Sequence, residues 1–304
     1  LVNSSKFTNI LLPLQTLAIK RLQYIFNRLI YKSKLDRVMK RKKSIGIFDS
    51  GVGGLSIARA IKEILPDENL VYFADIEFSP YGNKSQKTIN QRSEDIVNFL
   101  IKQDCKVVVM ACNTATVNAI SVLRSKFSIP IIGVEPAIKP AALQSKTGVI
   151  GVLATQQTLE SPSFQLLKSK YTQKVNIETQ ACPKFVSLVE SLNHDNKQAL
   201  EVTEQYIRPL LSKGCDQIVL GCTHFSFLRS TIDNVVGDEA NIIDTATPVA
   251  MQVKRQLHSN DLKKVEGVEG VVEFWTSGDP IKATESISEL WDQDVSVSKA
   301  ELIT

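Results

Sequence analysis

The sequence predicts an α/β protein made of two pseudo-symmetric lobes, each built on a doubly wound parallel sheet. Three observations predict this fold: short apolar runs alternate with helical stretches, two of these runs end in the same cysteine motif, and flanking segments repeat at a similar offset. Uninterrupted runs rich in Val and Ile are typical of strands buried on both faces of a parallel sheet. Strands that alternate with helices form βαβ units, which require helices on both faces of the sheet.

The internal repeat is clearest around four of the five cysteines. Cys105 and Cys112 are seven residues apart, Cys215 and Cys222 are also seven apart, and the second pair follows the first by 110 positions. QDCKVVVMACNTATVNAI therefore aligns with KGCDQIVLGCTHFSFLRS. Each segment contains an apolar run, a Cys with Thr within two residues, and then a predicted helix.

The other expected elements follow the same order in each half. SIGIFDS resembles VIGVLAT, and IPIIGVEP resembles ANIIDTATP, so each of these four segments is predicted to be a strand that leads into a polar turn. The helical stretches between the strands are expected at 56–65, 88–103, 158–170 and 197–213.

Composition and charge exclude several classes of protein. With 43% hydrophobic and 22% charged residues, the 304-residue chain is typical of a globular protein rather than a disordered, collagen-like or coiled-coil one. Residues 1–43 carry 11 Lys+Arg and one acid, so the other 261 residues hold 25 bases and 31 acids. An acidic folded part argues against a nucleic-acid substrate.

The N-terminal residues 1–42 are expected to be a basic extension outside the folded protein. The apolar stretch at 10–19 cannot extend further, because Lys20, Arg21 and Arg28 follow it. The roughly 18 apolar residues of a membrane span are therefore missing. The pattern also resembles a membrane-surface or organellar transit segment. Met39 stands shortly before the first expected strand, as the first residue of a folded domain would. This favours the interpretation of the preceding residues as an extension.

The cysteines indicate a reduced, cytoplasmic protein with no metal site. Five is an odd number, and no pair has the C-x-x-C spacing of a zinc or redox site.

Candidate functional residues follow the predicted strands. Ligands of open parallel sheets bind beyond the carboxyl ends of the strands. If the lobes face each other, the repeat places two cysteines on opposite sides of one cleft. The residues expected there are Asp49, Ser50, Cys112, Asn113, Thr114, Cys222, Thr223 and His224.

Two facing thiols suit inversion of a stereocentre. A thiolate on one face removes a carbon-bound proton and a thiol on the other face delivers one, without any cofactor. A helix N-terminus or a nearby cation can favour the thiolate. His224, two residues after Cys222, is expected to tune that thiol. A hydrolase would use Cys as nucleophile and His as base, which leaves one cysteine without a role.

The loop IFDSGVGGL at 47–55 is predicted to hold an anion on its backbone N–H groups, and a small carboxylate is the simplest ligand. It lacks the lysine of a Walker loop, and Ser56 stands where a dinucleotide fingerprint needs glycine. Asp75 has nearly the spacing of a ribose-binding acid, so an NAD site stays a minor alternative. Asp49 is expected to bind a substrate ammonium, to assist Cys112, or to cap the next helix.

The polar turn at 74–85 places Tyr81 and Gly82 either against substrate or at the surface. Glu190 is unremarkable from the repeat alone.

Six motifs together resemble bacterial glutamate racemase, within the aspartate/glutamate racemase family. They are IGIFDSGVGGLSI, FSPYGNKS, VMACNTATVNA, IIGVEPAIKPA, CPKFVSLVE and LGCTHFSFL. The resemblance covers the chain from about residue 43 to the C-terminus. The motif CPKFVSLVE departs from the family at Ser187, where Pro is usual.

The resemblance implies a cytoplasmic, cofactor-independent enzyme that interconverts L- and D-glutamate and supplies D-glutamate for peptidoglycan. It also implies a first lobe of residues 43–137 plus 246–304, a second lobe of residues 138–245, and a homodimer. An aspartate racemase is the nearest alternative. A binding protein on the same scaffold, with a DNA gyrase contact through the basic extension, is the other.

The resemblance also assigns residue roles. Cys112 and Cys222 are implied to be the acid/base thiols on the D- and L-glutamate sides, Asp49 to support Cys112, and Glu190 and His224 to support Cys222. The implied substrate contacts are Asp49, Ser50, Tyr81, Gly82, Asn113, Thr114, Thr223 and His224.

Overall fold

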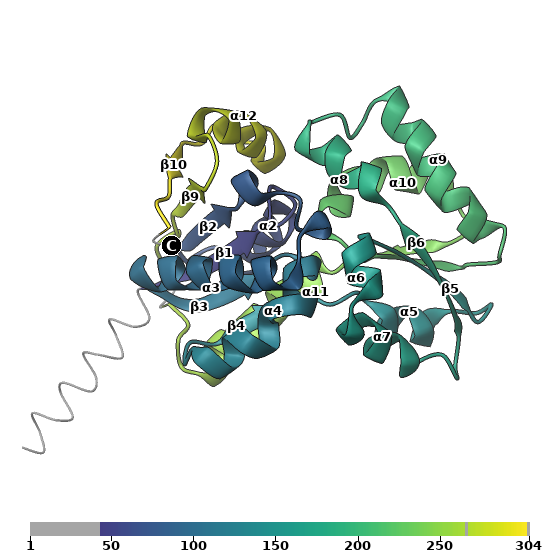
Figure 1. Cartoon of the computed structure of the whole chain (residues 1–304), viewed down its shortest axis with the longest axis horizontal. Coiled ribbons are helices and arrows are strands. Elements are labelled where there is room, and N and C mark those ends of the chain that lie inside the picture. Colours follow the sequence, from purple (N-terminus) through teal and green to yellow (C-terminus); the bar gives the residue numbers. More distant parts are fainter. Residues whose placement is uncertain (1–42, 265–266, 303–304) are drawn as a thin grey trace, which may run out of the picture. The chain divides into compact units, whose positions relative to one another are not determined.

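Two parallel sheets organise the part of the chain that the computed structural model describes, residues 43–264 and 267–302 (Figure 1). The basic extension predicted at 1–42 lies outside these residues. None of the described helices is long and apolar enough to cross a membrane.

The first sheet has six strands in the order β10-β9-β2-β1-β3-β4, all parallel. Its strands are β1 (Ser44–Asp49), β2 (Leu70–Ala74), β3 (Cys105–Met110), β4 (Ile131–Gly133), β9 (Val272–Thr276) and β10 (Val297–Lys299). One face is covered by α3 (Gln86–Lys102) and α4 (Asn113–Lys126). The other is covered by α2 (Leu55–Ile64), α11 (Ala246–Ser259) and α12 (Pro280–Trp291).

The second sheet has four parallel strands in the order β6-β5-β7-β8. They are β5 (Val149–Ala154), β6 (Asn176–Ala181), β7 (Gln217–Leu220) and β8 (Asn241–Ile243). The helices α5 (Ile138–Gln144), α6 (Gln156–Glu160) and α7 (Pro162–Ser169) pack on one face. The helices α8 (Pro183–Glu190), α9 (Lys197–Leu211) and α10 (Arg229–Val236) pack on the other.

Burial on both faces explains the uninterrupted apolar runs. In β1, Ile45 and Ile47 lie in the core beneath α2 and α11, whereas Phe48 lies in the core beneath α3 and α4. Successive side chains of a strand point to opposite faces, so both faces need apolar residues. The predicted α/β fold with two parallel-sheet lobes is therefore confirmed.

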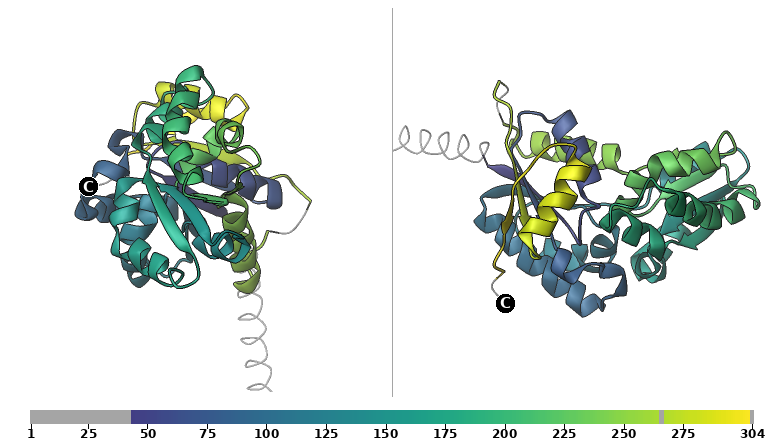
Figure 2. Two further views of the ribbon diagram at one scale, coloured as in Figure 1. Left: turned by 90° about the vertical axis from the view of Figure 1, so that its right-hand side faces the viewer. Right: turned by 90° about the horizontal axis from the view of Figure 1, so that it is seen from above.

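The chain leaves the first sheet after β4 and returns to it at β9. Figure 2 shows the yellow C-terminal helix and strands beside the purple and blue elements of the first lobe. Strands β1–β4, β9 and β10 thus form one sheet and β5–β8 the other, and the lobe limits of 43–137 plus 246–304 and of 138–245 stay a prediction.

Two predicted helices differ from the structure. The helix expected at 158–170 is divided into α6 and α7, because Pro162 lacks an N–H and disfavours helical geometry at Ser161, which caps α7. The helix expected after Cys222 starts as a 3₁₀ turn, η3 (Thr223–Leu228). There the Phe225 N–H donates to the Cys222 carbonyl at 3.1 Å, a tighter turn than that of α4.

Candidate active site

The predicted site residues follow neighbouring strand ends in the two lobes, and most are buried. Cys112 is 5% exposed and Cys222 is 7% exposed. Hydrogen bonds join the lobes around them: the Val52 N–H donates to Glu190 Oε1 at 3.2 Å, and Ser56 Oγ donates to the Thr223 carbonyl at 3.2 Å. The lobes are therefore closed over the site.

Cys112 caps helix α4 with its own sulfur. Its Sγ accepts a hydrogen bond from the Ala115 N–H at 3.4 Å and lies 3.7 Å from Ser50 Oγ. Burial, followed by the negative charge of Asp49, raises the pKa of Cys112 well above its usual range. The Ala115 N–H at the start of the helix lowers the pKa of Cys112, in the expected direction, but burial and the charge of Asp49 outweigh it. Burial beside Asp49 thus favours the protonated thiol of Cys112.

Asp49 connects the glycine loop to the Cys112 side of the site. Its Oδ2 accepts hydrogen bonds from the N–H groups of Gly51 at 3.3 Å and Gly54 at 3.0 Å, so it organises the start of α2. Its Oδ1 is buried and has no hydrogen-bond partner. Burial raises the pKa of Asp49, although the charge of His224 opposes this shift. A buried, half-satisfied carboxylate is an unusual feature that calls for a ligand or a proton.

Cys222 has a different neighbour, a histidine held by a carboxylate. His224 Nδ1 lies 3.7 Å from Cys222 Sγ, and His224 Nε2 lies 2.6 Å from Glu190 Oε1. Burial alone would lower the pKa of His224, but the hydrogen bonds to Cys222 and Glu190 raise it well above its usual value. The pKa of Glu190 is lowered despite burial, because His224, the Val52 N–H and Ser79 stabilise its charge. The group favours an imidazolium at His224 beside the Glu190 carboxylate.

Three backbone N–H groups of the glycine loop at 47–55 bind side chains of this protein and are not free to bind a ligand, contrary to the expectation of an anion site. Those of Gly51 and Gly54 bind Asp49, and that of Val52 binds Glu190. The glycines have another purpose: a Cβ at Gly51 would collide with the Glu190 carboxylate, and a Cβ at Gly53 with the His224 ring. Gly51 and Gly53 are therefore required where side chains of the second lobe pack directly on the loop backbone.

Hydroxyl and amide groups complete the site. Both polar atoms of the Asn113 side chain are buried without a hydrogen-bond partner. Thr114 Oγ1 lies 3.0 Å from Thr155 Oγ1 and 3.3 Å from Thr158 Oγ1, and Thr223 is buried. The sequence interpretation missed Thr155 and Thr158. The match of SIGIFDS to VIGVLAT could have found Thr155, because it places Thr155 at the repeat position of Ser50.

Asp75 is not a ribose-binding acid. It is fully buried, and its carboxylate is bound by Arg92 and by the Tyr81 hydroxyl, so no oxygen is left to face a nucleotide. Gly82 lies next to Thr155 of the second lobe, where an added Cβ would be 3.6 Å from the Thr155 Cβ. Tyr81 is buried and Gly82 lies beside Thr155, so neither is in a fully exposed surface turn.

Comparison with known proteins decides the family. Residues 53–253 match the Asp/Glu/Hydantoin racemase family. The chain belongs to this family. The glutamate racemase of Methylococcus capsulatus is 44% identical to this racemase over 247 residues, which cover 81% of this chain and 91% of that protein.

Solved structures of other racemases agree. A glutamate racemase isoform from Bacillus anthracis superposes with a TM-score of 0.78 at 29% identity, covering 86% of this chain and 98% of that one. The Escherichia coli glutamate racemase, solved with L-glutamate and the activator UDP-MurNAc-Ala, has a TM-score of 0.76 at 30% identity, covering 86% and 100%. The resemblance seen in the motifs is confirmed, and the chain is an isomerase of the racemase class.

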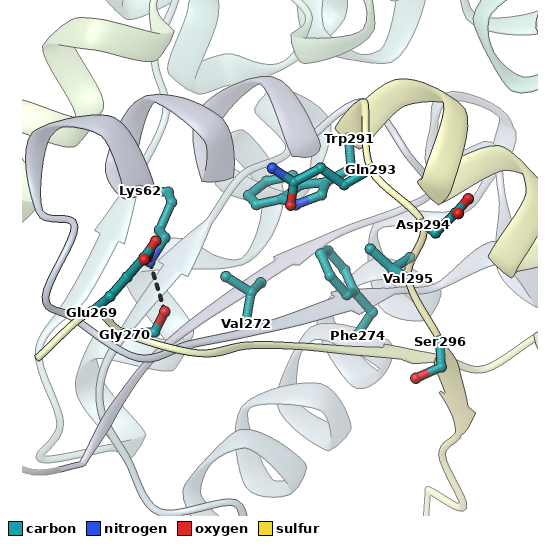
Figure 3. Close-up of a pocket in the computed structure, with 10 residues that line it drawn as sticks. All are labelled: Lys62, Glu269, Gly270, Val272, Phe274, Trp291, Gln293, Asp294, Val295 and Ser296. Carbon is teal, nitrogen blue, oxygen red and sulfur yellow. Dashed lines mark hydrogen bonds and ion pairs between the residues drawn. The ribbon is translucent and has the colours of Figure 1, made fainter.

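A separate cavity in this racemase lies at the outer side of the first lobe. It measures about 340 Å³ and is walled by Phe274, Trp291 and the end of α2 (Figure 3). Lys62 at its rim donates to the Gly270 carbonyl at 2.6 Å and pairs with Glu269 at 3.3 Å. None of the predicted site residues lines this cavity, so it is distinct from the thiol site.

Proposed function

We propose that this chain interconverts L- and D-glutamate by proton transfer at Cα between two thiols, Cys222 and Cys112, without a cofactor. One observation carries the proposal: the thiols follow equivalent strands of the two lobes, and each has its own acid/base neighbour. Cys112 has Asp49, and Cys222 has His224 with Glu190. The name glutamate racemase, borne by relatives over most of the chain, supports the substrate.

Conversion of L- to D-glutamate starts with Cys222 as the base. Its thiolate takes the α-proton, and the electron pair of the C–H bond stays on Cα. The thiol of Cys112 then gives its proton to the opposite face of Cα and becomes a thiolate. The burial that keeps Cys112 protonated suits it to this acid step, and imidazolium at His224 stabilises the thiolate of Cys222.

The reverse direction needs a base for Cys112. Asp49 is the group we propose, because its pKa is raised by burial and its Oδ1 is without a partner. The two thiols therefore exchange roles between directions, and each is supported by a different acid/base group.

Binding of glutamate is proposed at the buried polar groups around the thiols. Asn113 can donate from Nδ2 to a carboxylate and accept at Oδ1 from the ammonium, which would satisfy both orphan atoms. The remaining proposed contacts are Asp49, Ser50, Tyr81, Gly82, Thr114, Thr223 and His224. Supply of D-glutamate for peptidoglycan, a cytoplasmic location, a homodimer and a gyrase contact all stay predictions.

The test is proton exchange in D₂O. Purified protein with L-glutamate and EDTA should lose optical rotation and gain deuterium at Cα. Cys222→Ser should abolish exchange of the α-proton of L-glutamate. The Cys112→Ser variant should still exchange the α-proton of L-glutamate, but without inversion at Cα. Cys105→Ser, which changes a buried thiol outside the site, is the control and should keep the wild-type rate.

Three outcomes would contradict the proposal. A Cys112→Ser variant that racemises at the wild-type rate would exclude the two-thiol mechanism. Activity with aspartate but not glutamate would assign a different substrate, and inactivity with both would favour a binding protein on this scaffold.

A further inference from the structure

A buried ion pair lies directly behind the proposed site and has no role in the proton transfers. Arg92 of α3 donates from Nη2 to Asp75 Oδ1 at 2.6 Å and from Nε to Asp75 Oδ2 at 3.1 Å. The Tyr81 hydroxyl donates to the same Oδ2 at 2.5 Å. Asp75 is fully buried, and Tyr81 and Arg92 are buried as well.

The arginine is fixed in orientation as well as in charge. Its guanidinium lies 3.8 Å above the centre of the Phe78 ring, so the ring and the carboxylate together define its plane. Lysine has no planar fork and cannot bind both oxygens of Asp75 in this way. The guanidinium thus fixes the positions of three side chains in the segment 75–81: Asp75 and Phe78 by direct contact, and Tyr81 through its hydrogen bond to Asp75.

This segment reaches the site on several sides. Extended to residue 83, the segment contains two short 3₁₀ turns, η1 (Ile76–Phe78) and η2 (Tyr81–Asn83). Tyr81 packs in the same apolar core as Cys112. Gly82 lies next to Thr155, and Ser79 stabilises the charge of Glu190. A shift of the segment would therefore change the surroundings of both Cys112 and Cys222.

We propose that Arg92 and Asp75 are positioning residues for racemisation: they hold the Tyr81 ring and the 81–83 turn against the Cys112 side of the site. This inference rests on the proposed function. The Tyr81 hydroxyl proton is directed to Asp75, so the tyrosine acts through its placement and not as a proton donor to the substrate.

The kinetic test is a double-mutant cycle on glutamate racemisation. Arg92→Lys should lower kcat/KM by of order 100-fold, mostly through KM, because a small misplacement of binding groups has effects of this size. Tyr81→Phe breaks the link to Asp75, so Arg92→Lys in that background should lower kcat/KM by less than about threefold. Arg59→Lys is the matched control, because Arg59 binds only the Leu290 carbonyl among the contacts described.

A second readout does not need activity. Cys112 should react faster with iodoacetamide in Arg92→Lys than in wild type, since a displaced turn uncovers this thiol, whereas buried Cys105 should react at an unchanged rate. Peptide mass spectrometry measures both thiols in one sample. If the wild type does not racemise glutamate, the proposed function fails, and the alkylation rates still decide the role of Arg92.

Three results would overturn the positioning role. The first is wild-type kcat/KM and Cys112 alkylation in Arg92→Lys. The second is an equal loss of kcat/KM in both backgrounds of the cycle. The third is equal acceleration of alkylation at Cys112 and Cys105 with a lowered Tm, which would show a general loss of stability.

Discussion

Replacing Glu190 with Gln tests whether the carboxylate sets the protonation state of the site. The substitution keeps the size of the side chain and an oxygen that can accept from His224 Nε2, 2.6 Å away, and from the Val52 N–H. It removes only the charge. A charge-assisted hydrogen bond is about twice as strong as a neutral one, so the loss is about 1–1.5 kcal/mol. The pKa of His224 should therefore fall, and kcat/KM should fall by about tenfold.

The assay is polarimetry in both directions as a function of pH, together with an NMR titration of His224. Since L- and D-glutamate have equal free energies, kcat/KM must fall by the same factor in both directions, whereas the two kcat values are free to differ. The control is Glu178→Gln, which removes a carboxylate that pairs with Lys213 on the surface of the second lobe at 2.7 Å. That variant should stay within about threefold of wild type.

The same variant has a pH signature in stability. The folded-state pKa of His224 is raised, so its contribution is fully present below the unfolded pKa of about 6.5 and is lost as pH rises through the folded pKa. In Glu190→Gln the loss should still begin near pH 6.5, but it should be complete at a lower pH and smaller in total. Unchanged kcat/KM and an unchanged His224 titration in this variant would refute the reasoning.

Three other substitutions or conditions test separate parts of the structure. Gly53→Ala places a methyl group in the His224 ring, so racemisation measured by polarimetry should fall by of order 100-fold; a wild-type rate would contradict the packing. Lys106→Met leaves the buried Glu68 carboxylate without its ammonium partner at 2.5 Å, so the free energy of unfolding in urea should drop by about 3–5 kcal/mol; a drop below about 1 kcal/mol would contradict this. Burial raises the pKa of Cys105 to about 12, so stability should fall by up to about 1.4 kcal/mol per pH unit above about pH 8.5, and Cys105→Ala should flatten that slope in denaturation curves.

The positions of the strand ends were predictable because they depend on local pattern. Apolar runs without alternation require a sheet covered on both faces, and parallel strands bring their carboxyl ends to one edge. The repeat of the cysteine motif then placed Cys112 and Cys222 in equivalent positions. No contact between distant segments was needed for these inferences.

The supporting groups were not predictable from the residues alone, because they depend on packing between lobes. Glu190 and Val52 are 138 positions apart, and nothing in the local sequence of either indicates the hydrogen bond between them. The protonation of Cys112 depends on its burial beside Asp49, which outweighs the helix terminus. Asp75 has nearly the sequence spacing of a ribose-binding acid, but in the folded protein its carboxylate pairs with Arg92.

The closed contact between the lobes has a consequence for the timing of turnover. Glutamate can reach groups as covered as Asn113 only while the hydrogen bonds that cross at Glu190 and Thr223 are broken. In that open state Cys112 and Cys222 sit on separated halves and cannot act on one Cα. Under the proposed two-thiol mechanism, chemistry is thus confined to the interval between closing and reopening. Each catalytic cycle therefore includes an opening of the lobes, and the rate of that opening is an upper limit on kcat.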